Sequence, residues 1–237
     1  MYEITILCLA NSRKPPSGRC IAGKVYANGR TTADWVRPVS ARPTHEVSEE
    51  ERRYEGGTKA QLLDIISLPL RQASPSRHQV ENHTLDDQYY WEKEGTATWA
   101  QVKAAVDPYD AKFWGNSQST YHGLNDKVPE AAVDAIGSSL KLILVADLVI
   151  SVSRENGYEG NPSRRRVRAK FTFRNTQYWM SITDPEIEEK FLTQGDGEYQ
   201  IGEAALCISL AEVWNGFAFR VVASVITPNR CEALDEL

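Results

Sequence analysis

Cysteine is scarce in this chain of 237 residues, and the few that occur lie far apart. No two of them form a CxxC pair, which argues against a structural zinc site and against a redox dithiol. Three of the four sit inside apolar runs, where a free thiol behaves as a small buried hydrophobe. We therefore expect free thiols in a reducing compartment at Cys8, Cys20, Cys207 and Cys231.

Long apolar runs are also missing. The longest, residues 140–152, is interrupted by Lys141 and Asp147 and is too short to span a bilayer. Met1 and Tyr2 lead directly into EITILCLA, without a basic stretch before it or a small-residue cleavage site after it, so no secretory leader is predicted. With the unpaired cysteines, this predicts a cytoplasmic protein that does not enter a membrane.

Catalytic motifs are absent as well. The sequence has no GxGxxG, GxxxxGK[ST] or GxSxG loop, and its histidines lack the HExxH or HxE spacing of metal hydrolases and deaminases. We predict no catalytic residue, no metal site and no cofactor, and we lean toward a protein that is not an enzyme. Acidic residues are plentiful, so a metal site built from clustered carboxylates stays open.

The first half of the chain is rich in short strand patterns. An apolar strand is expected at residues 2–10, then a turn at 11–18 whose prolines cannot join a sheet, then a strand at 19–26. Asn28-Gly29 predicts a tight hairpin into a strand that runs to Val39. Further strands are expected at 62–70 and 79–85, a surface helix or loop at 42–57, and short helices at 99–106 and 128–136.

The second half is also rich in short strand patterns. Strands are expected at 140–153, 166–174, 178–183, 205–210 and 218–226. Asn175-Thr176 predicts a turn, and Asp184 before Pro185 predicts the N-cap of a short helix. The fold class is therefore mainly β with a few short helices. We predict two tandem OB-type five-stranded barrels, at 1–106 and 138–237, with a connecting segment at 107–137. A single larger barrel or sandwich is the alternative.

Charge is unevenly distributed along a chain whose net charge is −5. Residues 138–183 carry eight basic and three acidic side chains, whereas residues 184–237 carry three basic and eleven acidic ones. Within the basic part, apolar and basic residues alternate from 166 to 174. A period of two places Val167, Ala169, Phe171 and Phe173 on the core and the basic residues on the open face.

This alternating strand predicts a polyanion-binding face. Its candidate phosphate contacts are Arg166, Arg168, Lys170 and Arg174, and its candidate stacking residues are Tyr178 and Trp179. Two plainer interpretations stay open. Basic residues also protect exposed sheet edges, and the acidic C-terminal part could neutralise the arginines from within the molecule.

A second candidate site lies near the N-terminus. The expected loop at 11–18 and the following strand supply cationic contacts (Arg13, Lys14 and Arg19) and polar contacts (Asn11 and Ser12). The facing strand supplies Trp35 for stacking and Arg37 for an anion. The alternative is structural: Asn11 and Ser12 would cap turns, and Arg19 would pair with a carboxylate such as Asp34.

The segments CLANSRK, GRCIAG, DWVRPVS, HQVENHTL and ALCISLAEVWNGFAFRVVASVI together resemble the bacterial dual-OB-containing domain family. The resemblance covers essentially the whole chain. It implies two OB barrels in tandem and a suspected role in nucleic-acid transactions, including prokaryotic conflict systems, with no catalytic residues. In the family's closing strand a lysine stands where this chain has Arg220, which keeps the charge. The matching residues are Asn11, Ser12, Arg13, Lys14, Arg19, Trp35, Arg37 and Pro38.

The sequence thus predicts a non-catalytic nucleic-acid-binding module, for single-stranded or structured nucleic acid. One alternative is a sensor of a small anionic ligand such as a nucleotide, held between residues 11–19 and the strand of Trp35 and Arg37. Another is an adaptor whose acidic C-terminal region docks a protein partner.

Overall fold

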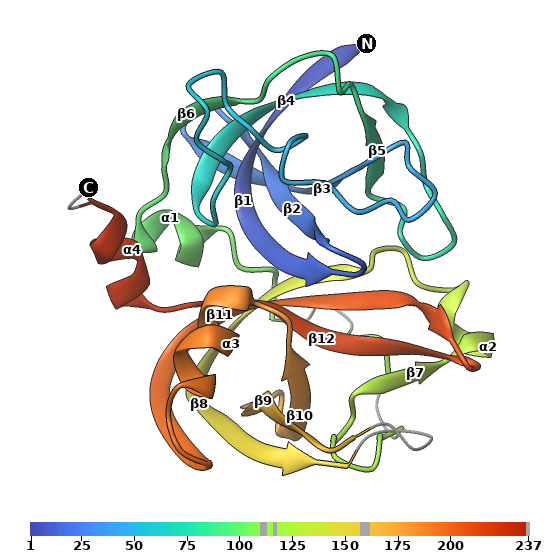
Figure 1. The fold of residues 1–237 in the computed structure, drawn as a ribbon, viewed down its shortest axis with the longest axis vertical. Coiled ribbons are helices and arrows are strands. Elements are labelled where there is room, and N and C mark those ends of the chain that lie inside the picture. Colours follow the sequence, from blue (N-terminus) through green and yellow to red (C-terminus); the bar gives the residue numbers. More distant parts are fainter. Residues whose placement is uncertain (110–112, 116–117, 157–161, 236–237) are drawn as a thin grey trace.

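Strands dominate the molecule and close into two barrels stacked one above the other (Figure 1). The structure is a computed structural model, and it describes residues 1–109, 113–115, 118–156 and 162–235. The predicted mainly β fold with two OB-type barrels is confirmed, and a single larger barrel is excluded because the strands form two separate sheets.

The first barrel closes through the pairing of β1 with both β2 and β4. Its strand order is β1-β2-β3-β5-β4, and β3 and β5 run parallel. The strands are β1 (Tyr2–Lys14), β2 (Gly18–Ala27), β3 (Arg30–Val39), β4 (Asp64–Ala73) and β5 (Asn82–Leu85).

The second barrel repeats this order with its own strands. It runs β8-β9-β10-β12-β11 and closes between β11 and β8, and again its third and fifth strands, β10 and β12, are parallel. This is the Greek-key arrangement of an OB-type barrel. The strands are β8 (Leu140–Glu155), β9 (Arg164–Phe173), β10 (Thr176–Ile182), β11 (Gly197–Trp214) and β12 (Phe217–Ile226).

The remaining elements lie at the edges and ends of the barrels. Asp184 caps α3 by accepting a hydrogen bond from the Ile187 amide, as predicted. Neither β6 nor α4 was expected. The helix expected at 128–136 is wrong in its first part, because those residues pair with the edge of β12 instead. The elements are β6 (Glu92–Thr96), α1 (Trp99–Ala104), β7 (Lys127–Pro129), α2 (Glu130–Val133), α3 (Pro185–Leu192) and α4 (Pro228–Asp235).

Tight hairpins connect several of these strands. The predicted turn at Asn28-Gly29 is confirmed, with φ values of 53° and 79°. The β9–β10 turn lies one residue earlier than predicted, since the positive φ values belong to Arg174 and Asn175. The expected turn at 11–18 is wrong at its start, because β1 continues to Lys14 and the turn is confined to residues 15–17.

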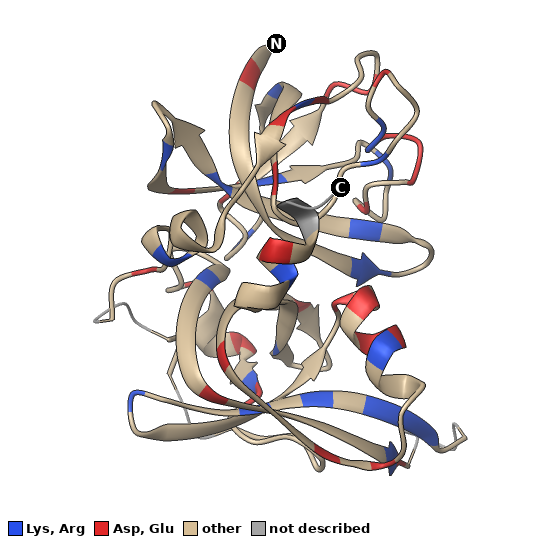
Figure 2. Ribbon diagram, turned by 90° about the vertical axis from the view of Figure 1, so that its left-hand side faces the viewer, with Lys and Arg blue, Asp and Glu red and all other residues tan. Residues whose placement is uncertain are grey.

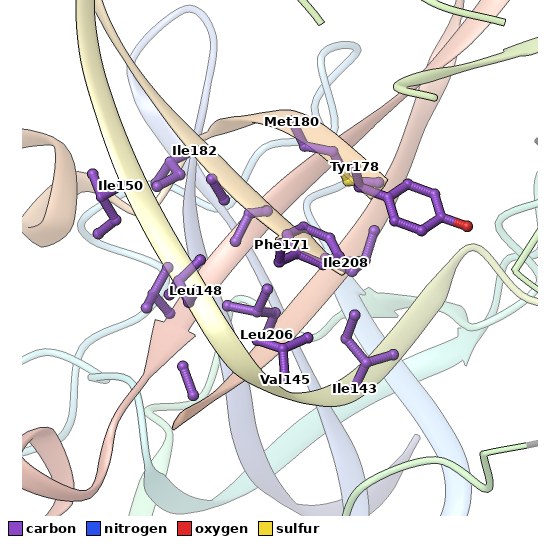
Figure 3. Packing of buried hydrophobic residues seen from close by; sticks show 14 of the residues in the cluster. Ile143, Val145, Leu148, Ile150, Phe171, Tyr178, Met180, Ile182, Leu206 and Ile208 are labelled. Carbon is purple, nitrogen blue, oxygen red and sulfur yellow. The ribbon is translucent and has the colours of Figure 1, made fainter. Parts of the chain in front are cut away.

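Each barrel encloses its own apolar core. In the second, inward-facing side chains of all five strands meet, among them Phe171, Tyr178 and Leu206 (Figure 3). In the first, the core includes Ile21 and Val36. The predicted alternation in β9 is confirmed, because Val167, Ala169, Phe171 and Phe173 are all buried.

A third apolar cluster joins the two barrels, and we call it the seam. Leu9 and Trp35 of the first barrel pack there against the cluster's members from the second, which include Leu142, Cys207 and Ala223. The outer surface of β1–β3 is thus covered by β8, β11 and β12. Burial of this kind contributes about 25 cal/mol per Å² of apolar surface, so the seam couples the stability of the two barrels.

Candidate nucleic-acid interface

Arg13 and Lys14 lie at the end of β1 and contact the second barrel. Arg13 pairs with Glu188 at 2.8 Å, and Lys14 pairs with Glu212 at 3.1 Å. The Arg13 amide also donates to the carbonyl of Thr183 at 2.9 Å. The expected loop is corrected, because these residues sit in a strand and their charges meet carboxylates of the same chain. Their contact with phosphate stays a prediction.

The other N-terminal candidates are held by the first barrel. Arg19 pairs with Glu49 at 3.3 Å rather than with Asp34. The Asn11 amide donates to the carbonyl of Ala60 at 3.2 Å, and Ser12 is only 4% exposed. Of these, we keep none as a leading ligand contact.

Trp35 and Arg37 project into the junction between the barrels instead of into a pocket. The Arg37 guanidinium lies 3.2 Å from the Glu81 carboxylate, donates to the Ser139 hydroxyl at 2.9 Å, and is 3% exposed. Trp35 is part of the seam. The predicted stacking role of Trp35 and anion contact of Arg37 are corrected, because a ligand cannot reach either side chain.

The alternating strand β9 does present an open face, and blue segments mark basic residues along the lower barrel (Figure 2). Arg168 stands opposite Ser181 of β10, and Lys170 stands opposite Trp179. Together with Arg166, these side chains form what we call the basic face. Three of the predicted phosphate contacts are thus brought together on one surface beside an aromatic residue.

The charges of the basic face differ in how strongly the protein holds them. Arg168 makes two hydrogen bonds to Glu155, at 2.5 and 2.9 Å, and this pair is largely buried. Lys170 pairs with Glu198 at 2.5 Å in a more exposed setting. Arg166 makes no ion pair with any residue the structure describes. Partial burial, and then the charge of Arg164, lowers the pKa of Arg166.

The aromatic candidates of β10 point in opposite directions. Trp179 is 39% exposed, and its ring lies 4.4 Å from the Lys170 ammonium. Tyr178 is 1% exposed and stacks on Phe171 inside the core (Figure 3). The predicted stacking role of Tyr178 is wrong. Successive residues of a strand face opposite sides, so Tyr178 points into the core when Trp179 points outward.

Arg174 lies apart from the basic face. It occupies the β9–β10 turn, and its guanidinium carbon lies 5.4 Å from the Tyr109 ring. It lines a different cavity, of about 630 Å³, together with Trp114 and Lys141. The fourth predicted phosphate contact therefore does not join the other three.

A second feature, which we call the hollow, adjoins the basic face and has a volume of about 650 Å³. Arg166 and Arg168 form part of its lining, and the β11–β12 hairpin supplies Trp214 and Asn215. In OB folds, the second and third strands and the loops between strands one and two and strands four and five bind the ligand. The hollow lies at that position. Its other lining residues are Thr120, Tyr121, His122, Asp126, Lys127, Asn156, Ser181, Phe217, Phe219, Arg220 and Val221.

Arg220 fixes one side of the hollow. The guanidinium donates to the backbone carbonyls of Asn125 at 2.5 Å, Trp114 at 2.8 Å, and Gly115. Burial lowers the pKa of Arg220 to about 10, so the side chain stays protonated at neutral pH. A permanent positive charge therefore stands at the base of the hollow.

Sequence reasoning missed most of the hollow. Asn215-Gly216 between two apolar runs is a hairpin signal, and it would have placed Trp214 and Phe217 at one tip. The contributions of Tyr121 and His122 carry no comparable signal, because they come from a connecting segment without periodicity. Only the closed barrel brings that segment beside β9.

The acidic C-terminal part pairs with two basic residues of β9, Arg165 and Lys170, whereas Arg168 pairs with Glu155 of β8. The C-terminal carboxylates at 184, 186, 188, 196, 198 and 212 all form ion pairs with lysine or arginine. Arg166 is outside this network. Arg166 is therefore available to an external anion, although the C-terminal part of the chain is acidic.

Within the part of the chain that the structure describes, no group of three or more His, Cys, Asp or Glu side chains is arranged to hold a metal ion. None of the described helices is both long and apolar enough to cross a membrane.

Comparison with known families agrees with this topology. A family model described as a dual OB-containing domain matches residues 4–225, so the chain belongs to that family. No curated protein and no solved structure matches the chain. The match supports an OB-fold module.

Proposed function

We propose that the second barrel binds single-stranded nucleic acid along the basic face. One observation carries this proposal: Arg166, Arg168 and Lys170 project from alternate positions of β9, beside the exposed ring of Trp179 on β10. Cationic side chains that follow a backbone, next to an aromatic platform for a base, are the two parts of a single-strand site.

The ion pairs suggest which residues meet phosphate first. The exposed pair of Lys170 with Glu198 contributes about 0–1 kcal/mol, so a phosphate can replace the carboxylate at little cost. The pair of Arg168 with Glu155 is buried, and separating it would leave an uncompensated charge. Arg166 needs to give up no ion-pair partner among the described residues. Arg166 and Lys170 are therefore the primary contacts.

Single strands fit this surface better than duplexes. An exposed indole such as Trp179 can stack only on a base that is not already paired and stacked in a helix. Such stacking contributes about 1–3 kcal/mol per base. The face therefore favours an unpaired strand and reads little sequence, since every base has a π-face.

Fluorescence anisotropy tests the proposal with labelled single-stranded DNA, single-stranded RNA and duplex at low and high salt. We expect binding that grows with oligonucleotide length and weakens with salt. The double variant Arg166→Gln/Lys170→Gln should reduce the slope of log affinity against log salt by about 1.4, because each lost phosphate contact removes about 0.7 for a single strand.

Arg30→Gln is the matched control, because Arg30 is an exposed arginine of the first barrel. It should leave both affinity and salt slope unchanged. If the double variant binds as the wild type does, the basic face is only a solvated surface and the proposal fails.

A sensor of a small nucleotide is the second candidate, and the hollow, of a size typical of small-ligand sites, favours it. The pocket expected between residues 11–19 and Trp35 is not its location, because Trp35 is buried in the seam. A mononucleotide that raises the melting temperature, without any length dependence for oligonucleotides, would support this candidate. Docking of a protein partner by the acidic C-terminal region, a role in a conflict system and a cytoplasmic location stay predictions.

A further inference from the structure

Residues of the connecting segment border the hollow beside β10. Leu124 of the connecting segment forms a two-way backbone bridge to Trp179, with N–O distances of 3.0 and 3.1 Å. Beyond it, β7 pairs with the edge of β12. A strand lying across the basic face therefore reaches the connecting segment at the hollow.

Buried nitrogen atoms without hydrogen-bond partners gather around this hollow. Nη1 of Arg168, Nε of Arg220 and Nε2 of His122 each lack a partner among the described atoms, and all three residues line the hollow. An unsatisfied buried donor costs about 1–3 kcal/mol, and more for a charged group. His122 can donate from Nε2 when that nitrogen carries the proton. The two arginines of this set would attract a ligand with several acceptor oxygens.

One carboxylate shares the lining, and its oxygens are already engaged. Asp126 accepts hydrogen bonds from the amide and the hydroxyl of Thr120 at 2.7 and 2.6 Å. Its distance to Arg168 is 3.9 Å. Among the described lining residues, Arg166, Arg168, Lys127 and Arg220 stand against this acid, so this part of the lining favours an anion.

Aromatic side chains complete the hollow. Tyr121 is 93% exposed and Trp214 is 56% exposed, while the Lys127 ammonium lies 4.0 Å from the Phe217 ring centre. A base can stack on such rings while its phosphate meets the cations. The volume of about 650 Å³ lies in the range of small-ligand sites, about 300–1,000 Å³, which suits one nucleotide rather than a continuing strand.

We propose that the hollow receives the phosphorylated end of a single nucleic-acid strand whose remaining nucleotides follow the basic face. This inference rests on the proposed function and adds that the hollow recognises the terminal phosphate of the strand. A terminal phosphate carries about −1.5 to −2 charges and three free oxygens, so the cationic lining of the hollow attracts it more strongly than an internal phosphodiester.

The test compares oligonucleotides of one sequence, about twelve nucleotides long to cover one OB site. They carry a 5′-phosphate, a 3′-phosphate or hydroxyls at both ends, and they compete with an internally labelled strand. A circular strand of the same composition has no end at all. We expect one phosphorylated form to bind about tenfold more tightly than the hydroxyl form, and the circle to lack that gain.

Two sets of variants separate the hollow from the basic face. His122→Ala and Lys127→Gln should reduce the preference for the phosphorylated end to about twofold or less, and should weaken binding of the hydroxyl form by a smaller factor than binding of the phosphorylated form. Lys170→Gln should instead weaken all linear forms to a similar degree, because Lys170 lies outside the hollow.

The outcomes distinguish the two proposals. Equal affinity for phosphorylated, hydroxyl and circular strands overturns the end-recognition inference and leaves single-strand binding intact. Loss of the preference in Lys170→Gln alone, with the His122 and Lys127 variants unchanged, also overturns it. Absence of binding to any strand overturns both.

Discussion

The two barrels carry the same pair of side chains at the same place in the same topology. In the first, Lys24 on the second strand stands opposite Trp35 on the third. In the second, Lys170 stands opposite Trp179. The ammonium lies 5.5 Å from the indole centre in the first pair and 4.4 Å in the second.

Burial makes the two pairs different. Lys24 and its partner Asp107 have side chains 3% and 8% exposed, whereas Lys170 and its partner Glu198 are 24% and 57% exposed. The second barrel packs against this surface of the first at the seam. In the second barrel the connecting segment borders the surface and leaves Trp179 exposed. The same OB face therefore joins the barrels in one copy and stays available to a ligand in the other.

The connecting segment belongs structurally with the second barrel. Phe113 packs in that barrel's core, and β7 extends its sheet, while Asp107 reaches back to Lys24. We still propose barrel units at 1–106 and 138–237, with 107–137 between them.

The two lysine–tryptophan pairs should differ most in how much stability is lost when the lysine is removed. Lys24→Ala leaves Asp107 buried without its partner and should lower the free energy of unfolding by about 3–5 kcal/mol. Lys170→Ala should lower it by about 0–1 kcal/mol. Urea unfolding measures both. The double variant Lys24→Met/Asp107→Asn should recover part of the loss, and equal losses for the two single variants would break the comparison.

The tryptophans should separate stability from binding. Trp35→Ala opens a cavity in the seam and should cost about 3–5 kcal/mol of stability. Trp179→Ala should leave stability nearly unchanged and weaken single-strand binding by about 1–3 kcal/mol. Thermal unfolding and anisotropy give the two readouts. A binding loss for Trp35→Ala in protein that is still folded, without one for Trp179→Ala, would reverse the assignment.

Local patterns in the sequence were sufficient for the barrels themselves. The period of two in β9 and the Asn28-Gly29 turn depend on neighbouring residues only, and both are confirmed. The same period does not indicate what packs against the outer surface of a barrel. Lys24 and Lys170 both face outward, and the first is buried where Ala105 and Asp107 bind its ammonium.

The candidate site was predictable to the same extent. Arg166, Arg168 and Lys170 follow from one strand's alternation, so they were found together. The hollow draws on segments more than ninety positions apart, such as Tyr121 and Trp214. No sequence-local signal joins those segments, because their proximity is a consequence of barrel closure.

The smallest effect concerns Glu188 of α3, where Arg13 of the first barrel meets the second. Burial raises the pKa of Glu188, although Arg13 and Arg166 act in the opposite direction. A raised native pKa means that the folded state holds the proton more tightly than the unfolded one. The stability that Glu188 contributes is therefore present in acid and is lost as the pH rises through the raised native pKa.

Glu188→Gln should be more stable than the wild type at neutral pH, and the difference should shrink below the ordinary glutamate pKa of about 4.3. Urea unfolding across that range measures it, with Arg13→Gln as the opposing variant, since loss of the cation should enlarge the wild type's penalty at neutral pH. A Glu188→Gln protein that is less stable at neutral pH would show that the ion pair across the barrels outweighs the burial of its carboxylate.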